Sequence, residues 1–380
     1  MTKGFVHVTI IEEIGFEVRF MTKEKQDLII GIPRGMSFYG NYPFWHGFFT
    51  ALGFKIILSD PTTKQTMSDG SALVVTETCL PIKIYLGHIL NLINKKGVKN
   101  IFVPSLQSIA PKIYNCSKIR GLPDLVRNIV KGDFNIIEAT LDKSAKKQGL
   151  YEFLAESVAP FGITDMEKIK TASKQGWRVY NNFLVMMRAG MSYKKALENA
   201  LEGKVLIESQ TNSKPINVAL ISHGYNIYDE RACMKIFDKL EDMDVKVFTS
   251  LQLTQEQMEK GIASLGQKLH WANEYEMTGT AGHYLKDNKI DGIITLNAFG
   301  CGPDSLMIER VMRKAKEANK PMLSLTIDEH TGEAGFITRL EAFIDMLYRK
   351  KRSKIIKDIS IPEYEYTPQT NICDSIFSEK

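Results

Sequence analysis

The stretch that decides the fold is DGIITLNAFGCGPD, residues 291–304. Its first part, residues 291–296, is a short apolar run typical of a buried strand, and the glycines that follow it indicate a turn. Beyond the turn, the pattern over residues 304–317 predicts a helix. A strand that leads through a turn into a helix is the repeating unit of a parallel, doubly wound sheet.

The same plan recurs in both directions from this stretch. In the second half of the chain, further strands are predicted at residues 216–222, 244–248 and 321–327, with helices at 232–240 and 334–347. In the first half, strands are predicted at residues 28–33, 54–58, 72–75 and 100–104, with helices at 44–52 and 82–93. We therefore predict an α/β protein with two doubly wound Rossmann- or flavodoxin-like domains, each with a parallel sheet.

A helical segment is predicted to join the two domains, because residues 166–202 are amphipathic with helical spacing. Residues near the N-terminus alternate weakly and are compatible with a hairpin. The predicted organisation is an N-terminal extension (1–26), a first α/β domain (27–158), a helical connector (159–212), a second α/β domain (213–350) and a C-terminal tail (351–380).

Charge and composition are those of an ordinary globular protein. The 380 residues include 49 Lys and Arg against 44 Asp and Glu, for a formal net charge of +5. Because the two signs are scattered, we expect no nucleic-acid partner. No stretch approaches the roughly 20 apolar residues that span a bilayer, so we expect no membrane partner. Residues 1–20 contain Glu12, Glu13 and Glu17 and lack the layout of a signal peptide, so we expect a cytoplasmic protein.

Three of the five cysteines share a context. Cys79, Cys116 and Cys301 each follow a predicted strand, and ligands of open α/β sheets bind beyond the carboxyl ends of parallel strands. Cys233 falls on the apolar face of a predicted helix and is expected in the core. Cys373 lies in the unpatterned tail. A disulfide framework is not expected in a large cytosolic chain.

Thiolates are soft ligands that suit iron–sulfur clusters, zinc and copper(I). A cubane normally takes four protein ligands, so three cysteines would leave one iron open to chemistry. The spacing contains no C-x-x-C pair. From the cysteine positions alone, cluster binding, inert thiols, zinc binding and thiol catalysis all stay open.

Five further residues are candidates for the same site. Glu77, His223, Glu329 and His330 are candidate acids or bases, since each follows an apolar segment or precedes a cysteine, and imidazole titrates near neutral pH. Arg34 follows the first strand, and its planar guanidinium suits a carboxylate of a substrate. The alternatives are structural: strand-end carboxylates, a helix cap and a surface salt bridge.

Several ordered motifs resemble those of one known family. They cover roughly residues 27–348 and are the opening IGIPRG (30–35) with YPFW (42–45), ETCLPIK (77–83), YNC (114–116) with GLPD (121–124), GCGPDS (300–305), TIDEHTGEAG (326–335) and TRLEAF (338–343). The sequence resembles the 2-hydroxyacyl-CoA dehydratase-like family, and within it the branch of acyl-CoA dehydratase activase-related proteins.

The resemblance implies a 4Fe–4S or related cluster on Cys79, Cys116 and Cys301, between two similar α/β domains. It implies an electron donor, an ATP-hydrolysing activase of the actin-like superfamily that carries its own iron–sulfur cluster. Relatives either dehydrate 2-hydroxyacyl-CoA thioesters or reduce small molecules at a double-cubane cluster. Because only three cysteines are well placed here, the sequence departs from the double-cubane pattern.

The function expected from this resemblance is that of an electron-accepting catalytic component in an activase-driven, low-potential reductase or dehydratase-like system. Its substrate would be a small molecule, with an acyl-CoA thioester as one class. A homodimer or heterodimer is expected by analogy. The chain lacks a phosphate-binding G-x-x-x-x-G-K-[ST] loop, so we do not expect it to hydrolyse ATP itself. The alternatives are a non-catalytic electron-relay or assembly subunit and a zinc-binding or metal-free sensor module.

Overall fold

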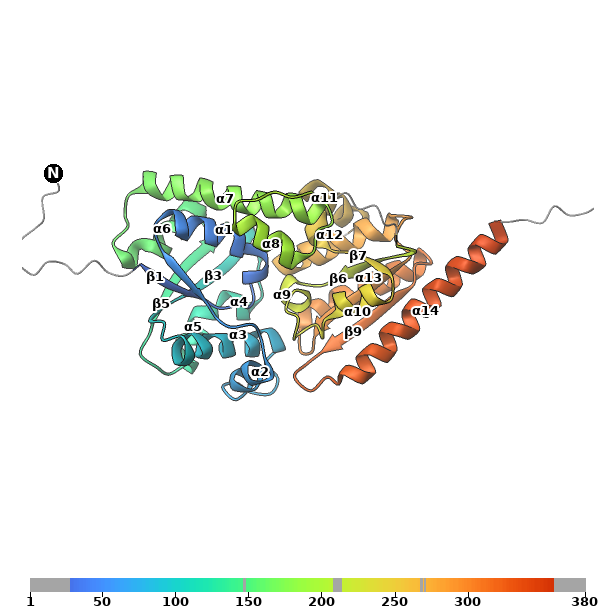
Figure 1. The fold of residues 1–380 in the computed structure, drawn as a ribbon, viewed down its shortest axis with the longest axis horizontal. Coiled ribbons are helices and arrows are strands. Elements are labelled where there is room, and N and C mark those ends of the chain that lie inside the picture. Colours follow the sequence, from blue (N-terminus) through green and yellow to red (C-terminus); the bar gives the residue numbers. More distant parts are fainter. Residues whose placement is uncertain (1–27, 146–147, 208–213, 267–268, 270, 359–380) are drawn as a thin grey trace, which may run out of the picture.

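A computed structural model describes residues 28–145, 148–207, 214–266, 269 and 271–358 (Figure 1). The hairpin predicted within residues 1–26, and Cys373, lie outside these residues. Within them, two sheets lie side by side, with helices above and below each sheet (Figure 1).

The first sheet is parallel apart from one short strand. Its order is β2 (Lys55–Leu58), β1 (Ile29–Ile32), β3 (Asn100–Ala110) and β5 (Asn135–Asp142). The short strand β4 (Ile113–Tyr114) pairs antiparallel with the end of β3. This hairpin extends β3 beyond its pairing with β1.

The second sheet repeats this order with parallel strands only. Its order is β7 (Val245–Phe248), β6 (Ile216–Ile221), β8 (Gly292–Ala298) and β9 (Met322–Ile327). The second strand of each half lies on one side of the first strand, and the third strand lies on the other side. This order confirms the prediction of two doubly wound, Rossmann- or flavodoxin-like units, and it creates a crevice at the carboxyl ends of the strands.

Apolar helix faces cover both sides of each sheet. In the first half, α1, α6 and α7 pack on one face, and α3 and α5 pack on the other. In the second half, α12 and α13 cover one face, and α10 and α14 cover the other.

The helices of the first half and connector are α1 (Phe38–Ala51), α2 (Lys64–Ser71), α3 (Leu80–Leu90) with a π-turn η1 (Asn91–Lys95), α4 (Ser117–Arg120), α5 (Leu122–Ile129), α6 (Leu150–Val158), η2 (Ala159–Phe161), α7 (Met166–Arg188) and α8 (Tyr193–Leu201). Those of the second half are α9 (Gly224–Ile227), α10 (Ile236–Asp242), η3 (Ser250–Gln252), α11 (Gln255–Ser264), α12 (Ala272–Lys286), α13 (Gly302–Glu317) and α14 (Glu333–Asp358).

The segment before Cys79 differs from the sequence prediction. Residues 72–75 form turns between α2 and α3, so the strand predicted there was wrong, and Val75 is 70% exposed. The chain instead forms α2, which starts at a capping box on Thr63 and packs closely on α3. A Cβ built on Gly70 would lie 1.7 Å from the carbonyl oxygen of Lys83, so this helix packing requires glycine. A four-residue apolar run cannot by itself distinguish a strand from half-buried turns.

The helix predicted at residues 232–240 begins later than expected, at Ile236. The Asp229 carboxylate accepts the backbone N–H groups of Arg231 and Ala232 at 3.0 Å, which stabilises a turn in place of a first helical turn. Cys233 lies in this turn and is 1% exposed, so its predicted place in the core is confirmed. At the other end, α14 continues to Asp358, beyond the helix predicted to end at residue 347.

The long helix α7 runs along the top of the first half and reaches the second half at its end, near α11 and α12 (Figure 1). It contacts α1 through backbone at Gly47 and Gly176, where a Cβ on Gly47 would lie 2.8 Å from the Gln175 carbonyl oxygen. No helix among the residues that the structure describes has the length and hydropathy of a membrane span.

Candidate metal centre

The three predicted cysteine ligands have the same local structure. Cys79, Cys116 and Cys301 are the N-cap residues of α3, α4 and α13, and each has an extended backbone. Proline follows within the first turn of α3 and of α13, which fixes those helix starts. The N-terminus of a helix carries partial positive charge, so it favours the thiolate form of a cysteine placed there. The sequence predicted that each of the three cysteines follows a parallel strand. This is correct for Cys301, which follows β8, but Cys79 and Cys116 do not directly follow parallel strands.

Cys79 lies within electrostatic range of both Cys116 and Cys301. Burial raises the pKa of Cys79, Lys118 opposes the rise, and Cys116 adds to it. Burial, then Asp304, raises the pKa of Cys301 well above its ordinary value, and Cys79 adds to that rise. Three thiols from separate segments of the chain therefore share one electrostatic environment.

Contacts between the halves hold the three cysteine segments together. A Cβ built on Gly300 would lie 3.3 Å from the carbonyl oxygen of Glu77, so the loops that carry Cys79 and Cys301 touch. A backbone bridge between Tyr114 and Trp271 ties the Cys116 segment to the second half. In addition, Leu80 and Ile84 of α3 belong to the buried apolar cluster of the second half.

The four cysteines among the described residues differ in their exposure. Cys79, Cys116 and Cys301 are free thiols that stay partly accessible, whereas Cys233 is a buried free thiol. The thiols that would hold a cluster are therefore Cys79, Cys116 and Cys301. Across the described ranges, no group of three or more His, Cys, Asp or Glu side chains is arranged to hold one metal ion.

A buried ion pair stands beside Cys301. His223, the N-cap of α9, contacts Asp304 with 2.8 Å between Nε2 and Oδ1, and both side chains are 3% exposed. Burial opposes a charge on His223, but Asp304 and Glu276 outweigh it and raise the pKa of the imidazole to about 10. The Oδ2 atom of Asp304 has no hydrogen-bond partner of normal geometry, although the Cys301 thiol lies near enough to interact with that carboxylate. His223 is therefore a charged group fixed by Asp304, and it is not a free base.

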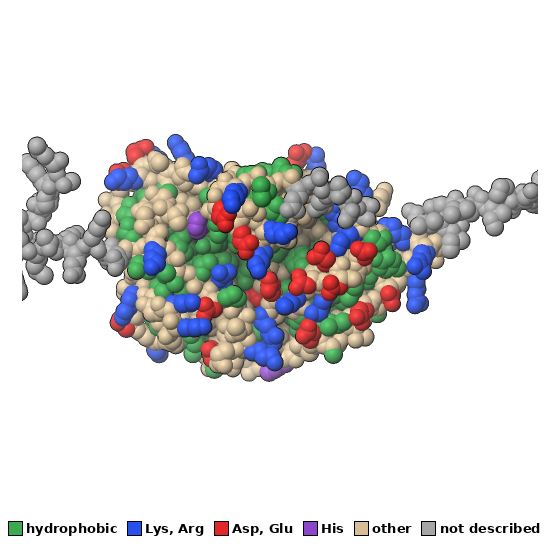
Figure 2. All heavy atoms as spheres, in the orientation of Figure 1, with side chains coloured by type: hydrophobic (Ala, Val, Ile, Leu, Met, Phe, Trp, Pro, Cys, Tyr) green, Lys and Arg blue, Asp and Glu red, His purple; other side chains and the backbone are tan. Residues whose placement is uncertain are grey.

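A cavity of about 240 Å³ lies in the crevice between the halves. The start of α1 and the Cys116 segment line it on one side, and the segment after β6 and the start of α12 line it on the other. Its polar lining residues include Ser37, Tyr39, Asn115, His223, Tyr225 and Glu276. Apolar side chains also show at the centre of the face drawn in Figure 2, where the halves meet, among interspersed acidic and basic side chains.

The remaining predicted site residues have different surroundings. Arg34 is held by Ser59, through its backbone N–H to Oγ at 2.9 Å and its Nε to the carbonyl oxygen at 2.8 Å. It does not line the cavity, and its guanidinium lies over the Phe38 ring at 5.7 Å. Glu77 is exposed beside Cys79, and the structure gives its side chain no partner among the described residues.

Glu329 and His330 are neighbours in the sequence, but their side chains have different surroundings. Glu329 forms an ion pair with Lys83 of α3, whose side chain is 2% exposed, and so joins the two halves. The side chain of His330 is 84% exposed, and its Nε2 lies 4.0 Å from Glu329. Of the four predicted acid–base residues, the structure places His223 in the cavity wall and Glu77 next to Cys79, whereas Glu329 is a contact between the halves and His330 faces solvent.

Sequence reasoning did not assign a role in this site to Asp304, Glu276 or Lys83, and of residues 223–226, which follow a predicted strand, it proposed a role only for His223 and not for Tyr225. Asp304 could have been found, because it follows a strand end in the motif GCGPDS. Glu276 and Lys83 lie within helices, and only the assembled structure brings them to the crevice.

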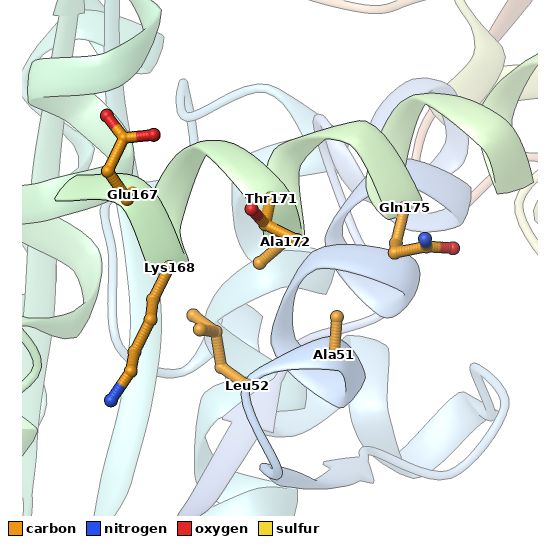
Figure 3. A pocket seen from close by; sticks show the side chains of 7 residues that line it. All are labelled: Ala51, Leu52, Glu167, Lys168, Thr171, Ala172 and Gln175. Carbon is orange, nitrogen blue, oxygen red and sulfur yellow. The ribbon is translucent and has the colours of Figure 1, made fainter. Parts of the chain in front are cut away.

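A larger hollow of about 500 Å³ lies elsewhere, between the end of α1 and the first turns of α7 (Figure 3). Its lining side chains include Leu52, Glu167, Lys168 and Gln175 and none of the predicted site residues, whereas His223 lines the smaller cavity. The larger hollow lies at the opposite end of α1 from the crevice cavity, which is lined by the start of that helix. We therefore assign the site to the smaller cavity.

Comparison with protein families gave two matches that together cover both halves. The family described as CoA enzyme activase uncharacterised domain matches residues 29–253, which is more than half of the chain. The family described as 2-hydroxyglutaryl-CoA dehydratase, D-component, matches residues 180–347, which include Cys301 and the His223–Asp304 pair. A search of curated proteins gave no match.

Proposed function

This chain belongs to the 2-hydroxyacyl-CoA dehydratase and activase-related family, and we propose that it is the electron-accepting, iron–sulfur component of an activase-driven reductase or dehydratase-like system. The observation that supports the proposal is that Cys79, Cys116 and Cys301 each stand at a helix N-terminus, on segments that contact the opposite half of the chain. A 4Fe–4S cluster on these thiols would accept single electrons and keep one iron open to a small molecule.

The residues of the chain have defined tasks in this proposal. The helix N-termini act against burial, which raises the pKa of Cys79 and of Cys301, and bound iron would stabilise the thiolates further. His223 and Asp304 form a fixed pair of opposite charges beside Cys301, which holds that thiol in one orientation. The crevice cavity offers a small molecule a partly enclosed position next to these groups.

The proposal includes partners and location. The electron donor would be an ATP-dependent activase of the actin-like superfamily with its own cluster, and the substrate would be a small molecule, with acyl-CoA thioesters as one class. Pairing with a second subunit is part of the same proposal. We also propose a cytoplasmic location, where Cys79, Cys116, Cys233 and Cys301, which are free in the structure, would stay reduced.

A reductive titration tests the electron-accepting function. The chain is reconstituted anaerobically with iron and sulfide and then titrated with dithionite, while the visible absorption is followed. We expect the absorption to bleach with uptake of about one electron per chain, as for a single cubane. A chain that binds zinc or no metal, or a cluster that accepts no electron from dithionite, would contradict the proposal.

A further inference from the structure

Tyr225 lines the crevice cavity beside His223 of the buried ion pair. It lies in α9, directly after the strand β6 and one residue beyond the glycine that follows His223. Its ring packs against the His223 imidazole, with 5.0 Å between the ring centroids. The residue is partly buried, and it lines the cavity.

The hydroxyl of Tyr225 has no hydrogen-bond partner in the part of the chain that the structure describes. Other buried tyrosines nearby do have partners: Tyr39 donates to Asp229 at 3.0 Å, Tyr193 to the Tyr39 carbonyl oxygen at 3.0 Å and Tyr284 to the Thr249 carbonyl oxygen at 3.1 Å. Because Tyr225 is only partly buried and lines the cavity, its free hydroxyl is available to a ligand.

The surroundings keep this phenol protonated. Burial, then Asp304, raises the pKa of Tyr225 well above its ordinary value, and Cys301, Cys116 and Cys79 each add to the rise. All three thiols therefore act on this one side chain. At neutral pH Tyr225 is a neutral hydrogen-bond donor within electrostatic range of the three thiols.

The cavity restricts what Tyr225 can contact. Its volume of about 240 Å³ is below the roughly 300–1,000 Å³ of pockets that enclose drug-sized ligands. It therefore suits a small molecule, or only the acyl end of a longer one. The polar groups around it favour a ligand that has at least one acceptor oxygen or nitrogen.

We propose that Tyr225 binds the ligand of this site, by donating a hydrogen bond from its hydroxyl to an oxygen or nitrogen acceptor of a small molecule held beside the three thiols. This inference rests on the proposed function, because it assigns the ligand to the iron that no thiol of the chain would bind. Tyr225 thereby selects small ligands with an acceptor atom over apolar ligands of the same size.

The test uses cyanide as the probe on anaerobically reconstituted, dithionite-reduced chain. Its binding is followed by electron paramagnetic resonance in the wild type, in Tyr225→Phe and in Tyr284→Phe. Tyr284→Phe is the matched control, because it removes a buried hydroxyl of the same half that bonds to Thr249 and does not line the cavity. We expect Tyr225→Phe to weaken cyanide binding about tenfold, as for loss of a hydrogen bond to a charged acceptor, while Tyr284→Phe stays within about twofold of the wild type.

A second measurement does not depend on any variant. Electron–nuclear double resonance of the cyanide-bound wild type, in H₂O and in D₂O, should detect an exchangeable proton next to the bound probe. Equal cyanide affinity in the wild type and Tyr225→Phe, a wild-type cluster that binds no cyanide, or the absence of the exchangeable proton would each overturn the role of Tyr225. A wild-type chain that holds no cluster would contradict the proposed function as well, so the two failures are distinguishable.

Discussion

At the residue scale, Asp304 links two side chains that are far apart in the sequence. It lies in the first turn of α13, where it interacts with the thiol of Cys301 and pairs with His223 of the neighbouring strand end. Both partners are buried, so each charge depends on the other. The motif around Cys301 pointed to a ligand, but the pairing with His223 could not be predicted, since it depends on β6 and β8 lying side by side.

The raised pKa of His223 predicts a pH dependence of folding. The pKa of His223 is about 10 in the folded chain, against an ordinary value near 6.5. Since the folded state binds the proton more tightly, the protonated imidazole stabilises the fold fully below pH 6.5. That contribution is lost as the pH rises from about 7 towards 10. Urea denaturation of the metal-free chain should therefore show a stability gap of about 3–5 kcal/mol between the wild type and His223→Gln at pH 6, which narrows at pH 9–10.

His330→Gln serves as the control for this prediction, because the side chain of His330 is 84% exposed. Its stability should follow that of the wild type at each pH. A gap between the wild type and His223→Gln that stays constant from pH 6 to pH 10 would show that His223 is not charged in the folded chain.

At the element scale, the sequence predicted helices and strands well where apolar runs were long and bounded by turns. Strand β8, with all seven residues buried, and the helix after it were predicted nearly in full. Two predictions were wrong because of local contacts. Close packing at the glycine between α2 and α3 is found where a strand was predicted, and the turn stabilised by Asp229 makes α10 begin later than predicted. Strand β5 and helix α6 were not predicted at all, because residues 135–158 mix polar and apolar residues.

Helix α3 positions Cys79 through two contacts, of which the first is its packing with α2. Gly70→Ala should destabilise the chain by more than about 3 kcal/mol, because its Cβ would lie 1.7 Å from the Lys83 carbonyl oxygen. Gly335→Ala is the matched control, since a Cβ there meets nothing within 4 Å, and alanine should be neutral or stabilise α14 by up to about 1 kcal/mol. Thermal denaturation compares the two variants; equal midpoints would contradict the close packing of α2 on α3.

The second contact of α3 is the ion pair of Lys83 with Glu329. Glu329→Gln leaves the buried lysine without its charged partner and should cost about 2–4 kcal/mol. The double variant Lys83→Met with Glu329→Gln should recover most of that loss, because no buried charge remains. Urea denaturation measures both. If Glu329→Gln kept full stability and instead abolished turnover, the catalytic role predicted from the sequence would stand in place of the structural one.

At the scale of the whole molecule, the site exists only because the two halves face each other. Tyr39 and Thr62 of the first half both donate hydrogen bonds to Asp229 of the second, and Thr62 also contacts His88 with 2.9 Å between Oγ1 and Nε2. The two contacts with Asp229 join residues more than a hundred positions apart, so no local pattern predicts them. The motifs predicted that Cys79, Cys116 and Cys301 share a site, whereas the crevice cavity and the pairing of His223 with Asp304 emerged only from the assembled structure.

The most direct test of the central claim is the iron and acid-labile sulfide content of the anaerobically reconstituted chain. The wild type and Cys233→Ala, whose thiol is buried in the core, should each hold about four irons and four sulfides. Cys79→Ala, Cys116→Ala and Cys301→Ala should each lose most of both, because each removes one of only three thiol ligands. Stoichiometric zinc in the wild type, or full iron and sulfide in any of these three variants, would contradict a cluster held by the three thiols.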